Sequence, residues 1–496
     1  MAEKHDYRQI FKATGLFGSV QVFNILIGFA RNKVVAVLLG KEGMGFSAML
    51  NLTLSIINSI TNMGLGYSAV RNISQATESG NLTEFSRTAI TFKRWMWFSG
   101  LLGTVITLAL SPMLSQWTFG TKDYTASFIW LAATFIINSQ AIARNTMLQG
   151  MRKLQLMARS NVFGSVVGLC ISLPLYYFFG MEGIVPAMII TAISGFLISW
   201  YLTRNIEVQP LKLTLRDSFF QGRDMVKLGI MTTLSAAAWN AANYLVNAYI
   251  SHTPEGLGDV GLYQSAHSIT NQTVNLVFTA MIVDFYPRLS AIHHDILKVR
   301  QTVNQQVEIA TLLITPLILA FVAFLPLVVR ILYTPEFMPI ILYIKWYFLG
   351  ILFKVTYWSL GYIFMAKGDT RLYLMVELSS CLIFLLFAVA GYTLFGLEGL
   401  GASYLVAHLL FCVIYYTIVR KRYGFRFNNP FFILITVQML LAIGLFVAVE
   451  FWGFPYATFV GVALFILSAL FSFREISKRI ALKEVLAEKF KRFKKQ

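Results

Sequence analysis

Two basic residues stand inside an apolar segment of membrane-spanning length, and their chemistry suits the binding of an anion. Arg31 and Lys33 fall within the stretch from Lys12 to Gly40. A cation near the middle of a bilayer is costly, so it normally faces a water-filled cavity or a partner inside a helix bundle. Asn24 and Gly28 precede Arg31 by seven and three residues, on the same side of a helix. We expect this face to line a cationic cavity; the alternative is that both cations extend to the headgroups.

Amide and hydroxyl side chains repeat at helical spacing in three further apolar segments. Offsets of three, four, seven and eleven residues place each set on one helix face. Together with Arg31, Lys33 and Asn24, the predicted substrate-binding residues are Asn51, Ser55, Asn58, Asn62, Asn240, Asn243, Asn247, Gln264, His267, Asn271 and Asn275. A single asparagine more often joins two helices through a hydrogen bond. Aligned stripes on several helices favour a hydrated cavity, in which His267 would bind an anion, relay a proton or stay neutral and hydrogen-bonded.

Other ionisable residues inside apolar segments have less specific roles. Lys354 and Glu377 fall in the same half of the bilayer, as a buried ion pair or as an ion-coupling site. Lys345 is expected to extend to the outer headgroups, and His408 to be structural. The sequence has no metal-spaced His/Cys set, phosphate-binding glycine loop or nucleophile with a base nearby. We therefore expect no enzyme and no cofactor; coupling to H⁺, Na⁺ or the membrane potential stays open.

The composition requires a membrane protein. Of the 496 residues 57% are hydrophobic and 13% charged, with a mean hydropathy of +0.65. Soluble proteins carry about a quarter charged residues. Windows of about 20 apolar residues predict an all-α polytopic fold with fourteen spans, near 13–39, 44–69, 92–113, 124–146, 157–179, 182–203, 228–251, 259–285, 308–332, 338–365, 372–394, 397–419, 430–450 and 455–472.

Basic residues indicate the orientation of these spans. With the N-terminus inside, 34 of the 41 Lys and Arg residues fall in inner segments, as the positive-inside rule requires. We predict that both termini are cytoplasmic. The net charge of +18 then follows from topology and attraction to the inner leaflet, which leaves no case for nucleic acid.

An internal repeat organises the spans. FGMEG at Phe179–Gly183 recurs as FGLEG at Phe395–Gly399, and the same offset of 216 relates Gly45 to Gly261. Each copy has six spans, and because six is even both copies enter the membrane in the same orientation, which gives a parallel repeat. We predict two six-helix bundles around a central cavity, at 1–203 and 228–422, joined by a cytoplasmic linker at 204–227. Two additional helices would occupy 423–472, and a basic tail at 473–496 would lie on the membrane or in solvent.

Several motifs give the chain a family resemblance. The LGKEGMGF turn from Leu39 to Phe46 and the GLGYSAVR run from Gly64 to Arg71 resemble the polysaccharide-transport and O-antigen flippase branch of the MOP exporter superfamily. Gly28–Arg31 resembles the first-helix motif of the related peptidoglycan-precursor flippases, which implies that Arg31 lines a substrate cavity. The chain departs from those proteins at Asn32, where they have an aspartate, and at His267, where they have an arginine.

The resemblance and the charges together suggest a function. We expect a flippase that moves an undecaprenyl-diphosphate-linked oligosaccharide, such as an O-antigen repeat unit, across the bacterial inner membrane. Arg31 would offset the desolvation of the diphosphate. The alternatives are a cation-coupled multidrug antiporter of the same superfamily and a membrane glycan polymerase or ligase. The expected partners are the lipid-linked oligosaccharide, membrane lipids and polysaccharide polymerase machinery, with the protein as a monomer.

Overall fold

The protein is built from helices. The structure is a computed structural model that describes residues 2–479, with side chains described from residue 23 onward apart from scattered positions between 67 and 287. Every regular element in this range is a helix. The chain forms two compact units: one runs from the N-terminus to Gly261 and includes Leu332–Thr334, and the other comprises Leu262–Ile331 and the chain from Pro335.

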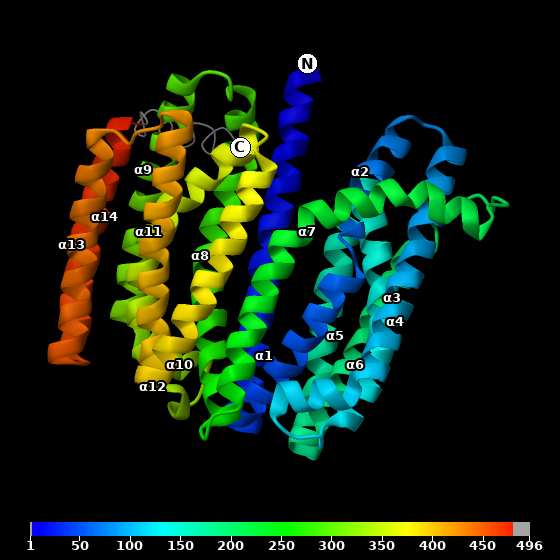
Figure 1. Ribbon diagram of the computed structural model, residues 1–496, viewed down its shortest axis with the longest axis horizontal. Helices are drawn as coiled ribbons and strands as arrows, with labels where there is room; N and C mark the ends of the chain where they lie inside the picture. The colour runs from blue at the N-terminus through cyan, green and yellow to red at the C-terminus, as the bar shows by residue number, and fades with distance from the viewer. Residues whose placement is uncertain (1, 480–496) are drawn as a thin grey trace, which may run out of the picture. The chain divides into compact units, whose positions relative to one another are not determined.

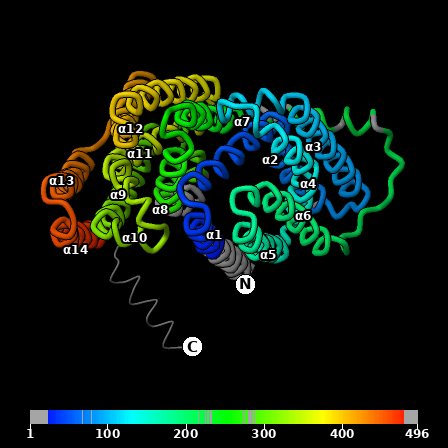
Figure 2. The backbone as a smooth tube through the Cα atoms, turned by 90° about the horizontal axis from the view of Figure 1, so that it is seen from below, coloured from blue at the N-terminus to red at the C-terminus, as the bar shows by residue number. Residues whose placement is uncertain are grey.

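The first unit contains seven helices and the first turns of an eighth. They are α1 (Ala2–Thr61), α2 (Leu65–Glu78), α3 (Leu82–Phe119), α4 (Thr125–Gly150), α5 (Leu154–Phe179), α6 (Ile184–Thr203) and α7 (Leu215–Ser251). α1 consists of two arms that meet at Gly40, whose φ of 65° reverses the chain. These arms are the first two predicted spans. α3 and α4 lie side by side, as do α5 and α6 (Figures 1 and 2).

Helix ends in this unit differ from prediction for local reasons. The second arm of α1 ends at Thr61, not near 69, because Met63 and Gly64 have positive φ angles of 48° and 64°. The expected linker is largely helical, since α7 begins at Leu215 behind a capping box formed by Thr214 and Asp217. The hydrogen bond from the Thr214 side chain lowers the pKa of the Asp217 carboxyl.

The second unit contains the remaining helices. They are α8 (Gly256–Ala291), α9 (Ile296–Ala323), α10 (Leu325–Leu332), α11 (Ile340–Ala366), α12 (Thr370–Tyr423), α13 (Asn429–Trp452) and α14 (Tyr456–Arg479). α13 and α14 pack against α9 (Figure 1). α12 is a hairpin whose two ends are tied together, because Arg422 donates to Asp369 at 3.2 Å; this contact lowers the pKa of the Asp369 carboxyl.

Backbone geometry supports the predicted duplication. Gly180, between α5 and α6, has φ 57° and ψ −133°, and Gly396, inside α12, has φ 58° and ψ −140°. These angles suit glycine, and the two positions differ by the predicted offset. Within the first unit, a Cβ added to Gly45 would lie 1.9 Å from the Leu257 oxygen, and one added to Gly261 would lie 1.9 Å from the Lys41 oxygen. The offset of 216 relates Gly45 to Gly261 and Lys41 to Leu257, so each of these two contacts is the counterpart of the other.

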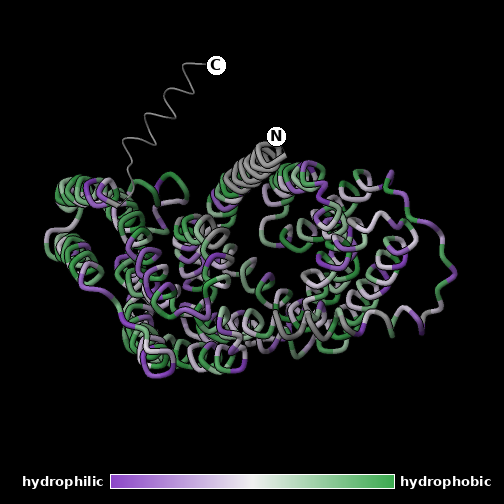
Figure 3. Tube along the Cα trace, turned by 90° about the horizontal axis from the view of Figure 1, so that it is seen from above, coloured by the Kyte–Doolittle hydropathy of each residue, from purple (hydrophilic) through white to green (hydrophobic). Residues whose placement is uncertain are grey.

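Hydropathy along the helices fits a protein that crosses the membrane many times (Figure 3). Among the described residues, nine helical segments are long and apolar enough to span a bilayer. Three of these, 23–61, 154–203 and 370–423, each overlap two predicted spans, and α7 and α8 contain two more. The total of fourteen stays a prediction. Most of the predicted basic tail, 480–496, lies outside the described residues.

Candidate functional site

A polar cavity of about 450 Å³ lies inside the first unit. Its wall is formed by both arms of α1 together with α4 and α6. Four of the predicted site residues gather there, namely Arg31 from the first arm and Asn51, Ser55 and Asn58 from the second. The reversal at Gly40 brings the two arms back along each other, which is why a cation and an amide stripe from consecutive helices meet.

Arg31 is the only ionic group in this wall as far as the structure describes it. Its side chain is half-buried, and none of the described residues forms an ion pair with its guanidinium. No described residue that lines the cavity carries a carboxylate. An unpaired guanidinium surrounded by amides and hydroxyls offers five N–H donors in a fork that matches phosphate oxygens. The cavity is therefore suited to an anionic, hydroxyl-rich ligand.

Helices α4 and α6 add polar groups that the sequence reasoning missed. Thr134, Asn138 and Asn145 on α4 and Thr191 on α6 line the same cavity. The Oδ1 atom of Asn145 and the Oγ1 atom of Thr191 are buried and have no hydrogen-bond partner among the described residues. The spacing of Thr134, Asn138 and Asn145 by four and seven residues was the available signal, because it follows one helix face.

Lys33, the second of the two cations predicted to line the site, has a different role. Lys33 donates to the backbone oxygen of Tyr333, and Asn32 Nδ2 lies 3.4 Å from the Tyr333 hydroxyl. Lys33 is therefore held by a chain segment of the same unit and does not line the polar cavity. Asn24 also makes a structural contact, since its Oδ1 accepts from Ser165 Oγ at 3.3 Å and joins α1 to α5.

The asparagines of α7 are mostly satisfied by their own surroundings. Asn240 donates to Ser59 Oγ at 3.0 Å, which links α7 to the second arm of α1. Asn243 donates to the Trp239 oxygen at 3.0 Å, and the fully buried Asn247 donates to the Asn243 oxygen at 2.7 Å. Asn62, which directly follows α1 and is the last residue of the predicted stripe, keeps a buried Oδ1 without a described hydrogen-bond partner.

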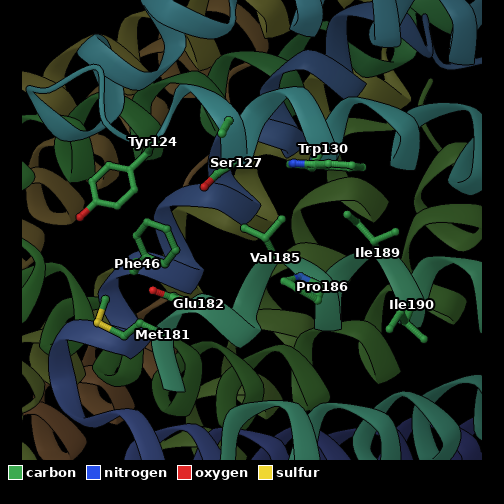
Figure 4. Close-up of a pocket in the computed structure, with 11 residues that line it drawn as sticks. Phe46, Tyr124, Ser127, Trp130, Met181, Glu182, Val185, Pro186, Ile189 and Ile190 are labelled. Atoms are coloured by element: carbon green, nitrogen blue, oxygen red, sulfur yellow. The ribbon is translucent and has the colours of Figure 1, made fainter. Parts of the chain in front are cut away.

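An apolar chamber of about 710 Å³ follows the polar cavity along α4 and α6 (Figure 4). Phe46, Trp130, Val185 and Ile189 are among its lining residues, and Glu182 contributes a carboxylate. Figure 4 shows Trp130 from α4 and Ile189 from α6 on opposite sides of the chamber. The α4/α6 groove is thus polar toward one end and apolar toward the other, which suits a ligand with a polar head and a hydrocarbon chain.

The predicted residues of α8 form a hydrogen-bonded cluster in the second unit. Asn271 Nδ2 donates to His267 Nε2 at 2.5 Å, and Asn271 Oδ1 accepts from the Tyr347 hydroxyl at 3.3 Å. Tyr347 stacks on Tyr404, with ring centroids 3.9 Å apart. These contacts fit the neutral, hydrogen-bonded alternative for His267. Gln264 is half-buried on the same helix, and the side chain of Asn275 lies outside the described residues.

The expected Lys354–Glu377 ion pair does not form among the described residues. The Lys354 ammonium lies 6.0 Å from the centre of the Phe278 ring, and Glu377 accepts a hydrogen bond of 2.7 Å from the Tyr415 hydroxyl. The two side chains extend from the middle of α11 and the first turns of α12, and each lies next to an aromatic residue.

The prediction for Lys345 was wrong. The side chain is 5% exposed, and its ammonium lies 2.7 Å from Glu398 and 2.5 Å from Glu450. These carboxylates come from the start of the second arm of α12 and the end of α13, so they share one end of the bundle with Lys345. The lysine therefore joins three helices, and His408 is likewise structural, buried and stacked on Tyr404 at 3.6 Å.

Comparison with known sequences places these features in context. Residues 34–342 match the family model described as "Polysaccharide biosynthesis protein". The Lipid III flippase of Escherichia coli (strain K12) is 22% identical over 397 residues, which cover 77% of this chain and 92% of that protein. The Lipid III flippase of Shigella flexneri matches to the same extent.

Solved structures show the same fold. Lipid II flippase MurJ in an inward closed conformation superposes with a TM-score of 0.73 at 12% identity, over 93% of this chain and 99% of that one. An inward-facing multidrug resistance MATE family transporter of the MOP superfamily gives 0.68 at 16% identity, over 82% and 98%. The chain is thus a multi-pass membrane protein with the MOP superfamily fold, and the expected superfamily resemblance is confirmed.

Proposed function

Because the chain belongs to the polysaccharide biosynthesis protein family, we propose that it is a flippase for an undecaprenyl-diphosphate-linked oligosaccharide. The cargo would be the repeat unit of an O-antigen or a similar surface polysaccharide. It would be moved by alternating access across the bacterial inner membrane, in which the protein would be a monomer with both termini cytoplasmic. The likeness to a lipid III flippase supports a lipid-linked cargo.

One observation carries the proposal most directly: the Arg31 guanidinium has no ion-pair partner among the described residues and lies in a cavity whose described lining residues carry no carboxylate. A diphosphate loses much of its hydration when it enters a membrane protein, and a fixed cation in a site of low dielectric offsets that loss. Asn51, Asn58, Asn138 and Asn145 would hydrogen-bond the adjoining sugars. Amides both donate and accept, so they can satisfy hydroxyl groups of varied stereochemistry.

The apolar chamber extends this assignment. A ligand whose diphosphate sits beside Arg31 needs a hydrocarbon environment for the isoprene units that follow it. Trp130, Val185 and Ile189 offer that environment along the same pair of helices. The chamber would accept the first part of the prenyl chain, and the remainder would stay in lipid.

The energy source belongs to the proposal as well. We keep Lys354 and Glu377 as candidates for coupling to H⁺ or Na⁺, in separate aromatic surroundings and not as a pair. The membrane potential alone would also act on a dianionic cargo, at about 2.3 kcal/mol per charge for each 100 mV.

A vesicle assay tests the function. The purified protein would be reconstituted in liposomes that contain a fluorescent undecaprenyl-diphosphate oligosaccharide, and an impermeant quencher would report which leaflet holds the label. We expect the label to cross only when the protein is present, and the glycan to keep its length. Lengthening of the glycan would identify a polymerase. Efflux of a cationic drug against a proton or sodium gradient, without movement of the label, would identify an antiporter. Either result would overturn the proposal.

A further inference from the structure

A second cavity in the first unit has a different chemistry from the proposed cargo site. It measures about 460 Å³ and lies between the first turns of α3 and the last turns of α4 and α6. Lys93, Arg144 and Arg204 line it, and no described lining residue carries a carboxylate. Its three cations come from α3, from α4 and from the residue that directly follows α6, so the fold itself gathers them at one place.

Buried hydrogen-bond donors in this cavity lack partners. Gln140 is 4% exposed, and its Nε2 has no hydrogen-bond partner among the described residues. Arg144 donates from Nη1 to Thr203 Oγ1 at 3.2 Å, while its buried Nε is likewise without a described partner. A buried polar group is normally hydrogen-bonded, so unpaired donors next to cations indicate an acceptor that carries negative charge.

Exposed aromatic side chains indicate the level at which the cavity lies in the membrane. Trp97 on α3 is 49% exposed, and Trp200 and Tyr201 on α6 are 48% and 57% exposed. The Arg204 guanidinium lies 4.3 Å from the centre of the Tyr201 ring. Amphipathic aromatic residues gather where the hydrocarbon meets the headgroups. Trp200 also lines the cavity, which places the cavity at the level of the lipid phosphates.

We propose that this cavity binds the headgroup of an anionic phospholipid from the surrounding leaflet. The phosphate would accept hydrogen bonds from Arg144 Nε and Gln140 Nε2, with Lys93 and Arg204 at the entrance. Ile90, Met147 and Val208 complete the wall with apolar surface that suits the glycerol and the start of the acyl chains. Basic pockets between membrane helices are suited to such headgroups. The site is separate from Arg31 and independent of the cargo.

Binding of fluorescent phosphatidylglycerol to the purified full-length protein in detergent tests the proposal. We expect saturable binding that unlabelled phosphatidylglycerol displaces and phosphatidylcholine does not. Arg144→Gln should weaken binding by about tenfold, because a charge-assisted hydrogen bond is lost. Gln140→Leu and Lys93→Gln should each weaken it by a smaller factor. Lys122→Gln removes an exposed loop cation outside the cavity, so it serves as the matched control and should bind normally.

Several results would overturn the proposal. Equal affinity for phosphatidylcholine would mean that the site does not distinguish an anionic headgroup from a zwitterionic one. Complete displacement by millimolar inorganic phosphate would identify a free-anion site, and displacement by undecaprenyl diphosphate at much lower concentration than by phosphatidylglycerol would identify a cargo site. Lys93 is exposed on α3, so Lys93→Gln is expected to fold even if Arg144→Gln does not. Unchanged binding in folded Lys93→Gln and Gln140→Leu proteins would then reject the site.

Discussion

Replacement of Arg31 by glutamine is the most direct perturbation of the proposed transport site. Glutamine keeps a polar, hydrogen-bonding side chain but removes the charge from a cavity that holds no other ionic group among its described lining residues. A hydrogen bond to a charged group contributes about 1.5–3 kcal/mol. At about 1.4 kcal/mol per tenfold, transport efficiency should fall by about 10- to 150-fold.

Two further variants separate charge from geometry. Arg31→Lys keeps the charge but loses the planar fork, so its loss should be intermediate. Lys122→Gln removes an exposed loop cation and should transport as the parent protein does. The assay is the rate at which a fluorescent undecaprenyl-diphosphate oligosaccharide crosses liposomes that contain equal amounts of folded protein.

A comparison of cargoes with different phosphate linkages gives the sharpest test of the role of Arg31. If Arg31 binds the diphosphate, the Arg31→Gln substitution should lower the transport rate of a monophosphate-linked analogue by a smaller factor than that of the diphosphate-linked cargo. An equal loss of transport rate for both cargoes would mean that the guanidinium binds the sugar or has a structural role. A parental rate for the glutamine variant with the diphosphate cargo would refute the electrostatic reasoning altogether.

Three other substitutions test separate parts of the structure. Asn145→Leu fills the polar wall with an apolar side chain of similar size and should lower transport of the glycan by about tenfold through one lost hydrogen-bonding group; unchanged transport would remove Asn145 from the site. Lys345→Met should lower the free energy of unfolding by about 1–2 kcal/mol, discounted because Glu398 and Glu450 are 36% and 41% exposed; denaturant titration in detergent measures it, and parental stability would contradict the three-helix role. His267→Ala should cost about 1 kcal/mol of stability and change the transport rate by less than about twofold; a larger change in rate at normal stability would return His267 to the cargo site.

The helices could be predicted well, because the length of an apolar stretch and the basic residues in the loops can be recognised from the order of residues alone, without knowledge of tertiary contacts. Each of the fourteen expected spans overlaps a helix of the structure, although the second span crosses the break between α1 and α2 and the ninth crosses the break between α9 and α10. The glycine corners at Gly180 and Gly396 belong to a motif that is repeated in the sequence, and their backbone angles match in the structure. Local features at helix ends were harder, since the capping of α7 by Thr214 depends on one hydrogen bond and not on hydropathy.

The site was predicted in part, because helix periodicity places residues on a face without showing what the face meets. Arg31 and the Asn51 stripe converge as expected, since a tight reversal at Gly40 forces consecutive helices together. The partners of Lys33 and Lys345 could not be predicted. Tyr333 is about 300 residues from Lys33, and Glu450 is 105 residues from Lys345, so these contacts arise only from the tertiary fold.

The two halves related by the offset of 216 differ in the surroundings of their polar residues. The offset of 216 relates Arg31 to Asn247, and Asn247 is fully buried and hydrogen-bonded within its own helix. The same offset relates Asn51 and Ser55, which line the polar cavity, to His267 and Asn271, which hydrogen-bond each other.

Equivalent positions therefore line a cavity in one copy and hydrogen-bond each other in the other, although His267 Nδ1 has no partner among the described residues. A polar group that already has a partner gains little from a ligand, because binding would exchange one hydrogen bond for another. The Arg31 guanidinium, which has no ion-pair partner among the described residues, and the buried Asn145 Oδ1, which has no described hydrogen-bond partner, gain the full interaction. The two polar stripes thus lie at related positions, and the proposed anionic cargo fits the first of them because Arg31 lines its cavity.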